Sequence, residues 1–335
     1  MSAPADAPLL EVQNLRTWFE IYQWGAIRVG AVKAVDGLSF TLGRGEAVAF
    51  VGESGSGKST LAQTLLGLHR PVEGEVIFDG LKLLELDRRG RHDYRRRIGY
   101  VQQDPYGALA PFMTVRRILA EPMIVHGIRD RAQQERRIRE VLDEVRLGPA
   151  DEVMEKFPHM LSGGQQQRVV IARALVLEPQ MIIADEPVSM LDASVRIEIL
   201  DLLRRIQTER ELTLAFITHD LSTVRHYADR IFVMYAGRIV EAAASEELLD
   251  HPAHPYTQGL LAAIADPDAA NAHQEREVPA GEPPSLLHPP PACRFHPRCP
   301  HFMKGLCDVE DPPDFLPRPN HPAACWLHQG QEVMR

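Results

Sequence analysis

The stretch EAVAFVGESGSGKST, residues 46–60, determines how the rest of the chain is interpreted. A short apolar run ends in Gly52 and leads through a loop into a helical pattern, KSTLAQTLLGL, so the segment predicts a strand, a loop and a helix. Residues 52–59 match G-x-x-x-x-G-K-[ST], in which the glycines permit a tight loop whose N–H groups converge on phosphate oxygens. Because the loop also opens a helix, whose N-terminus favours anions, the stretch predicts a nucleotide-binding site.

The positions of this loop have distinct expected tasks. Lys58 should reach the β- and γ-phosphates, and Ser59 should coordinate Mg²⁺. The loop residues expected to bind the nucleotide are Gly52, Ser54, Gly55, Ser56, Gly57, Lys58, Ser59 and Thr60. The loop by itself does not separate kinases, GTPases and ATPases.

Two adjacent acids favour hydrolysis. Asp185 ends the apolar run MIIAD, where it is placed to hold Mg²⁺, and Glu186 follows directly. A carboxylate beside the metal-binding one can orient or deprotonate an attacking water. The pair therefore predicts an ATPase or GTPase reaction, with Glu186 as the general base.

Composition limits the class of protein. The chain has 335 residues, with 44% hydrophobic and 25% charged residues, as in soluble globular proteins. The first residues lack the basic and apolar regions of a signal peptide, and no apolar run reaches the length of a membrane span, so a cytosolic location is expected. The net charge of −9 argues against a general nucleic-acid binder, and the basic cluster at 88–97 is interpreted as a solvated face.

Apolar runs and helical patterns alternate along most of the chain. Strands are expected at 9–19, 35–42, 46–52, 75–80, 97–103, 181–185, 212–219 and 230–237. From about 110 to 160 the pattern is helical, with a stripe of Ile138, Val141, Leu142 and Val145. This order favours a mostly parallel sheet with helices on both faces and a helical insertion. After residue 250 the composition is typical of a linker, followed by a tail that holds all four cysteines.

The stretch LSGGQQQR, residues 161–168, raises a separate question. Ser162 and Gln165 fit a capping box at a helix start, but Gly163 and Gly164 should each cost about 1 kcal/mol in the first turn. Together with residues 52–59 and the Asp185-Glu186 pair, LSGGQ resembles the nucleotide-binding subunit of ATP-binding cassette transporters. In that family two subunits pair head to tail, and the LSGGQ helix of one faces the γ-phosphate held by the other. The resemblance implies that Ser162, Gly163, Gly164 and Gln165 contact the ATP of a partner.

The same resemblance assigns further residues. Gln103, which is followed by DPYGALAP, is similar to the glutamine that contacts Mg²⁺ or the attacking water, although Gln102 competes. His219 resembles the histidine that contacts the γ-phosphate, and residues 189–192, SMLD, resemble a dimer-contact loop. An aromatic residue should stack on the adenine; Trp18, Phe19 and Tyr22 compete, and Phe19 is preferred. Catalysis is thus expected from Glu186, His219 and Gln103, and Mg²⁺ binding from Ser59, Gln103 and Asp185.

The end of the chain indicates which subfamily of ATP-binding cassette transporters the chain resembles. HPYTQGLLAAI and GEPPSLLHPPPACRFHPRCP are similar to the tail of subunits that energise di- and oligopeptide importers, with nickel and other small solutes left open. Cys293, Cys299, Cys307 and Cys325 follow a C-x5-C-x7-C-x17-C spacing, which suits a four-thiolate iron–sulfur cluster better than zinc. The resemblance also implies a [4Fe-4S] cluster here, and zinc or ordinary thiols remain the alternatives.

The expected fold is α/β: a P-loop NTPase of the ABC type with an antiparallel β subdomain, a helical insertion and a cysteine-containing C-terminal extension. We expect the ATPase domain at 8–250, with the helical subdomain at about 105–165, a Pro-rich linker or extension at 251–292 and the cysteine tail at 293–335. The resemblance implies a cofactor set of ATP and Mg²⁺, and action at the cytoplasmic side of the inner membrane. Its expected partners are a second, different ATPase subunit, two permease subunits and an extracytoplasmic solute-binding protein, with no nucleic acid. The rival classes are a soluble cassette ATPase acting on nucleic acid or ribosomes and a P-loop kinase.

Overall fold

The computed structural model describes residues 7–23, 27–263 and 281–334. The chain folds into two compact units, each of which is described by itself. The first unit comprises Met1–Leu10, Thr41–Ala47 and Ile77–Ile217. The second unit comprises Glu11–Phe40, Val48–Val76 and Thr218–Arg335.

A parallel sheet forms the centre of the first unit. It contains β6 (Ile98–Val101), β7 (Met181–Asp185) and β8 (Thr213–Thr218), in that order. Every residue of β7 is buried, because a parallel strand covered on both faces carries apolar side chains in both directions. Asp185 is the last residue of β7 and Glu186 follows it, so both lie where the carboxyl ends of the parallel strands meet. The expectation of an α/β fold with a parallel sheet is confirmed.

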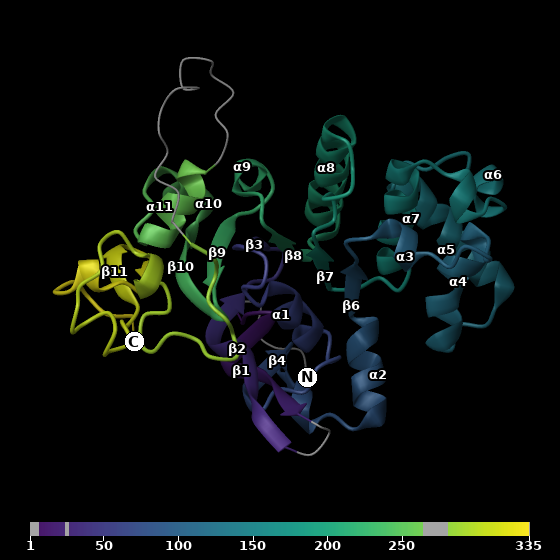
Figure 1. Cartoon of the computed structure of the whole chain (residues 1–335). Coiled ribbons are helices and arrows are strands. Elements are labelled where there is room, and N and C mark those ends of the chain that lie inside the picture. The colour runs from purple at the N-terminus through teal and green to yellow at the C-terminus, as the bar shows by residue number, and fades with distance from the viewer. Residues whose placement is uncertain (1–6, 24–26, 264–280, 335) are drawn as a thin grey trace, which may run out of the picture. The chain divides into compact units, whose positions relative to one another are not determined.

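Helices make up most of the rest of the first unit, and α4 to α7 gather into one group (Figure 1). The stripe predicted for the insertion is confirmed, since Ile138, Val141, Leu142 and Val145 are all buried. Helix α2 exposes nearly all of its basic side chains and buries only Tyr94, as expected for a solvated face. The smaller and helical elements are β5 (Leu81–Lys82), η1 (Leu83–Glu85), α2 (Arg88–Arg96), α3 (Pro105–Ala108), α4 (Val115–Val125), α5 (Arg131–Glu144), α6 (Ala150–Met154), η2 (Pro158–Met160), α7 (Gly163–Leu175) and α8 (Ala193–Arg210).

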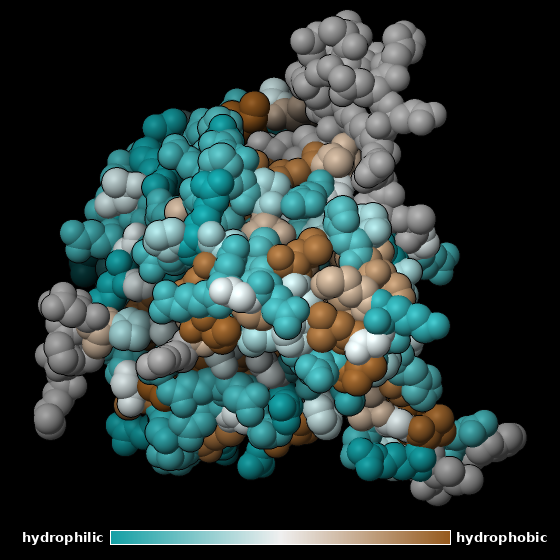
Figure 2. Space-filling view, turned by 90° about the vertical axis from the view of Figure 1, so that its left-hand side faces the viewer, coloured by the Kyte–Doolittle hydropathy of each residue, from teal (hydrophilic) through white to brown (hydrophobic). Residues whose placement is uncertain are grey.

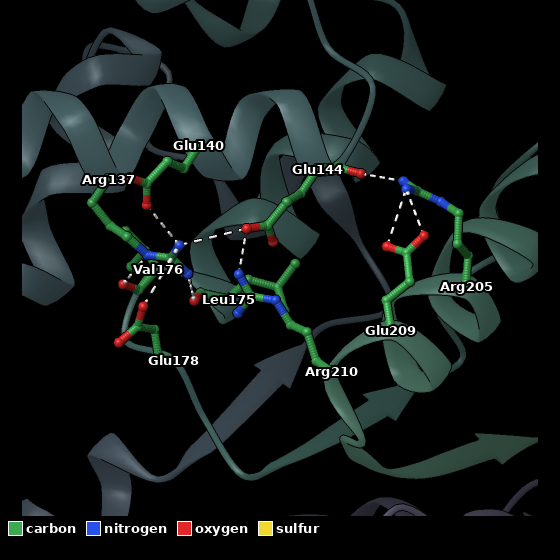
Figure 3. Close-up of polar contacts among 9 residues, drawn as sticks. All are labelled: Arg137, Glu140, Glu144, Leu175, Val176, Glu178, Arg205, Glu209 and Arg210. Atoms are coloured by element: carbon green, nitrogen blue, oxygen red, sulfur yellow. Dashed lines mark hydrogen bonds and ion pairs between the residues drawn. The ribbon is translucent and has the colours of Figure 1, made fainter.

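Arg137 and Glu144 of α5 connect this helix to α7 and α8 (Figure 3). Arg137 of α5 is 9% exposed and donates to the carbonyl oxygens of Leu175 (2.9 Å) and Val176 (3.2 Å), at the C-terminal end of α7. Glu144 accepts hydrogen bonds from Arg137 and from Arg210 of α8. A cation at the last carbonyls of a helix is favourable, so Arg137 fixes the far end of the helix that LSGGQ begins.

The second unit holds two sheets around an aromatic core. One contains β3 (Ala47–Val51), parallel to β9 (Arg230–Tyr235), followed by β10 (Arg238–Ala244), β12 (His321–Ala323) and β11 (Phe315–Arg318), which continue antiparallel. The other has the order β2 (Ile27–Leu42), β1 (Leu10–Gln23) and β4 (Glu73–Phe78). Phe40, Phe50 and Phe232 pack together with ring centroids 4.9–5.4 Å apart. This core supports the end of β3, where the phosphate loop begins.

The region after residue 250 differs from the expected linker. Helix α11 (Pro255–Ala262) begins there, and its Tyr256 is fully buried. The composition was misleading because Pro255 lies at the start of the helix, where proline is tolerated. Residues 264–280 of the expected linker lie outside the described residues. The remaining elements are α1 (Lys58–Leu65), α9 (Leu221–Val224), α10 (Ser245–Asp250), η4 (His296–Arg298) and η5 (Trp326–His328).

Helices of the described segments are all too short or too polar to cross a membrane. On the face shown in Figure 2, hydrophilic side chains predominate and hydrophobic ones form separate areas.

Candidate nucleotide-binding site

The phosphate loop belongs to the second unit and connects β3 to α1. Lys58 is 6% exposed, and its ammonium group donates to the carbonyl oxygens of Gly52 (2.6 Å) and Glu53 (2.9 Å) and to Ser56 Oγ (3.3 Å). Ser54, Gly55 and Ser59 are exposed. The lysine charge is thus held over the loop while several loop residues face solvent, which suits the binding of an anion.

Two glycines of this loop are required by close backbone contacts. A Cβ atom at Gly52 would lie 2.1 Å from the carbonyl oxygen of Met234, and one at Gly57 would lie 2.0 Å from that of Ala34. Gly57 also has φ +102°, which L side chains rarely adopt. Backbone packing within the chain therefore requires glycine at both positions.

The other predicted residues of the second unit differ in exposure. His219 follows β8 and is exposed. Phe19 is 37% exposed and meets His69 edge-on, with ring centroids 4.9 Å apart. The Trp18 side chain already has two partners: its indole N–H donates to Asp36, and the Lys33 ammonium lies 5.0 Å from its ring centroid. Among the three competing aromatics, Phe19 and Tyr22 present more open surface than Trp18.

Asp185 lies at the carboxyl end of β7 in the first unit and is 6% exposed. The Tyr100 hydroxyl of the neighbouring strand β6 donates to Asp185 Oδ2 over 3.2 Å. Burial, together with the charge and hydrogen bond of Asp185, raises the pKa of Tyr100, so the phenol stays a donor to the carboxylate. Sequence reasoning missed Tyr100, although its position in the strand RIGYV beside MIIAD was an available signal.

Glu186 adopts φ +45°, and its N–H donates to the carbonyl oxygen of Ile217. The amide nitrogen of Gln103 donates to Glu186 Oε2 over 2.9 Å, so the structure brings these two predicted catalytic residues together. This contact favours Gln103 over its neighbour Gln102. The carboxylate is half-buried and oriented, as a group that acts on water would need to be.

The LSGGQ segment forms the N-terminus of α7. The capping box is confirmed: Gln165 N–H donates to Ser162 Oγ (3.3 Å), and Ser162 N–H donates to the Gln165 side chain (3.0 Å). A Cβ atom at Gly164 would lie 2.7 Å from Val195 Cγ1 of α8. Packing against Val195 therefore disfavours a side chain at position 164, independently of any phosphate that approaches from a partner. The adjacent loop at 189–192 exposes Met190 and ends at Asp192, the N-cap residue of α8.

All four cysteines of the tail are free thiols. Burial, with a smaller contribution from the neighbouring cysteines, raises the pKa of Cys293 to about 11 and that of Cys325 to about 12. Within the described ranges, no three His, Cys, Asp or Glu side chains are grouped so as to hold a metal ion. The predicted iron–sulfur site is therefore not confirmed. The tail also does not stand alone, because β12 extends the sheet at β10.

Two residues beyond the predicted ATPase domain contact the phosphate loop within the second unit. Tyr256 Oη accepts a hydrogen bond from Glu53 N–H, and Arg298 binds the Glu53 carboxylate. Sequence reasoning read the segments around both residues only as a subfamily tail. No local pattern pointed to the loop, because more than 200 residues separate the partners.

Two family models and several known proteins match this chain. Residues 35–189 match the family model described as ABC transporter, and residues 240–307 match the one described as the C-terminal region of oligopeptide/dipeptide transporters. The oligopeptide transport ATP-binding protein AppF of Bacillus subtilis is 42% identical over 331 residues, which cover 98% of this chain and 100% of AppF. The dipeptide transport ATP-binding protein DppF of Escherichia coli is 42% identical over 299 residues, 89% of this chain and 88% of DppF.

A solved structure shows the same fold. The ATP-binding cassette MJ0796, in a dimeric post-hydrolysis state bound to ADP and Pi, superposes with a TM-score of 0.62 at 30% identity. The match covers 70% of this chain and 98% of MJ0796.

Proposed function

Because the chain belongs to the ABC transporter family, among the oligopeptide and dipeptide transport ATP-binding proteins, we propose that it energises the import of di- or oligopeptides. It is an ATPase that binds and hydrolyses ATP. The observation that carries the peptide assignment is the match of residues 240–307 to the C-terminal region of oligopeptide/dipeptide transporters, because the model matched by residues 35–189 is described only as ABC transporter.

The assigned roles follow the chemistry of each side chain. Lys58 and the loop N–H groups bind the phosphates, and the oxygen groups of Ser59, Asp185 and Gln103 are of the type that Mg²⁺ prefers. When bound, Mg²⁺ neutralises charge on the phosphates. Glu186, held by Gln103, takes the proton of the attacking water. His219 positions groups around the γ-phosphate, and Phe19 stacks on the adenine.

LSGGQ serves a second ATPase subunit in this proposal. Ser162 and Gln165 are exposed and the helix N-terminus is capped but open to solvent, which suits an anion presented by a partner. The two ATPase subunits act on two permease subunits at the cytoplasmic side of the inner membrane. An extracytoplasmic solute-binding protein supplies the permease with the solute. Closure on ATP and opening after hydrolysis drive the permease between its two states.

Affinity purification from detergent-solubilised membranes tests this function. We expect the wild-type chain to bind ATP, and to retain permease subunits and a paralogous ATPase identified by mass spectrometry. Lys58→Ala should lose ATP binding but keep the same partners. Recovery with ribosomes or DNA would contradict the transporter assignment, and uptake of labelled nickel but not of labelled peptides would contradict the peptide assignment.

We also keep the [4Fe-4S] cluster as a proposal for the cysteine tail. It is supported by the donor set, four cysteine thiols within one tail, although the thiols do not form a metal-holding group as packed. Anoxic purification should yield brown protein with about four iron and four sulfide per chain. Colourless, iron-free protein with four titratable thiols would reject the cluster.

A further inference from the structure

Glu53, the second residue of the phosphate loop, is bound by an arginine of the C-terminal tail. Arg298 Nη1 donates to Glu53 Oε2 (2.9 Å), and Arg298 Nη2 donates to Glu53 Oε1 (3.1 Å). The Arg298 side chain is 9% exposed, and Nη1 also lies 3.3 Å from the Tyr235 hydroxyl. Such a two-pronged pair fixes the carboxylate in orientation as well as in charge.

The backbone of the same residue is held from α11. Glu53 N–H donates to Tyr256 Oη over 2.9 Å. Tyr256 is fully buried, with its ring centroid 4.5 Å from that of Tyr235 and 5.4 Å from that of Phe295. Both the main chain and the side chain of Glu53 are thus fixed by segments that follow β10 in the chain.

A second arginine of the tail holds a turn that contacts the loop. Arg294 donates to the carbonyl oxygen of Ala236 and to the Asp36 carboxylate. The next residue, Gly237, donates its N–H to the carbonyl oxygen of Ser56 over 2.8 Å. The turn that contacts the loop at Ser56 is therefore itself held by the tail.

These contacts bear on phosphate binding through charge and preorganisation. An uncompensated carboxylate at Glu53 would repel a polyphosphate bound by the same loop. Loop N–H groups bind an anion more tightly when their geometry is fixed beforehand. We propose that Arg298 and Tyr256 are positioning residues for ATP, acting through Glu53, and that the tail is thereby part of the nucleotide-binding apparatus. The inference rests on the proposed ATPase function.

The affinity of the purified full chain for a fluorescent ATP analogue tests the proposal. We expect Arg298→Gln to weaken binding about tenfold and Tyr256→Phe, which keeps the ring, about threefold. In steady-state assays KM for ATP should rise while kcat at saturating ATP stays within about twofold, because binding and not chemistry is affected. The control is Arg318→Gln, which removes another tail ion pair, with Glu247 (3.3 Å), and should bind ATP like the wild type.

A charge rescue separates positioning from general stability. The double variant with Glu53→Gln and Arg298→Gln should regain most of the ATP affinity that Arg298→Gln loses, because no unpaired carboxylate remains. Arg298→Lys, which keeps a positive charge, should lose less ATP affinity than Arg298→Gln. Wild-type affinity in Arg298→Gln, or equal losses in Arg318→Gln, would overturn the proposal. A loss that neither Glu53→Gln nor Arg298→Lys relieves would overturn it too, as a folding effect. The ATPase assignment fails separately, if the wild type does not bind ATP or Lys58→Ala binds it unchanged.

Discussion

The Gln103 amide nitrogen lies 2.9 Å from Glu186 Oε2 and donates a hydrogen bond to it. Glu186 follows β7, Gln103 follows β6, and these strands are parallel neighbours. The residue assigned as general base is therefore oriented by a residue at the start of the helical insertion. A displacement of that insertion would change how the carboxylate is held.

Glu186→Gln should keep ATP affinity and lower the rate of phosphate release by about 100-fold or more, because an amide cannot accept the proton of water. ATP should then hold the two ATPase subunits together, as measured by size-exclusion chromatography. Glu152→Gln, at an exposed site of α6, is the matched control. An unchanged rate of phosphate release would rule out Glu186 as the base.

Ser162→Arg should abolish most ATPase activity of the assembled pair, by about tenfold or more, while this chain's own ATP affinity stays within about twofold. The bulky side chain would cover the helix end that serves a partner's nucleotide. Gln133→Arg, at an exposed position of α5, adds the same charge elsewhere. Equal activities of the two variants would contradict the shared site.

Gly164→Ala tests whether position 164 needs glycine because of packing against Val195 or because a partner's phosphate approaches the backbone. The new methyl would meet Val195 Cγ1 at 2.7 Å, so we expect a loss of about 1 kcal/mol in the free energy of unfolding. Adding Val195→Ala should recover that stability, as read from urea unfolding. If a partner's phosphate approaches the bare backbone, the ATPase rate should remain low in the double variant. Recovery of both would show that packing with Val195 is the whole requirement.

Acid should destabilise the fold around α11. His254 accepts a hydrogen bond from Tyr256 N–H, and burial lowers the pKa of His254 to about 4. Because the unfolded chain takes up this proton near pH 6.5, stability falls as the pH drops from 6.5 toward 4, by about 2 kcal/mol at pH 5. His254→Asn, which can still accept the hydrogen bond, should flatten this dependence in urea unfolding at pH 7.5 and 5. The exposed His251→Asn should leave it unchanged, and equal slopes for both variants would contradict the assignment.

Arg137→Met should lower the free energy of unfolding by about 2–3 kcal/mol, because the carbonyl oxygens of Leu175 and Val176 lose a buried charged donor. Methionine retains much of the apolar stem, so the loss reports on the guanidinium. The control is Arg139→Met, two residues further along α5. The ion pair of Arg139 with Asp151 is exposed, so this substitution should lower the free energy of unfolding by about 0.5 kcal/mol or less. Similar unfolding midpoints for the two variants would argue against the bridging role.

Much of the fold could be predicted because its signals are local. The loop at 52–59, the buried strand MIIAD and the stripe on α5 each follow from residue types at short spacing, and the structure has these elements where they were expected. The capping box at Ser162 is equally local. By contrast, the linker prediction after residue 250 was wrong for α11, since burial of Tyr256 there depends on Tyr235 and Phe295, which are distant in sequence.

The chemical groups of the site can be predicted from the sequence, because glycines, Lys58, Asp185 and Glu186 indicate phosphate and metal chemistry by residue type and spacing. The hydrogen bonds that orient the side chains appear only in the folded chain: from Tyr100 to Asp185, from Gln103 to Glu186 and from Arg298 to Glu53. The reason is physical. Periodicity and loop geometry are properties of neighbouring residues, whereas a hydrogen bond across strands or from a tail depends on how distant segments pack.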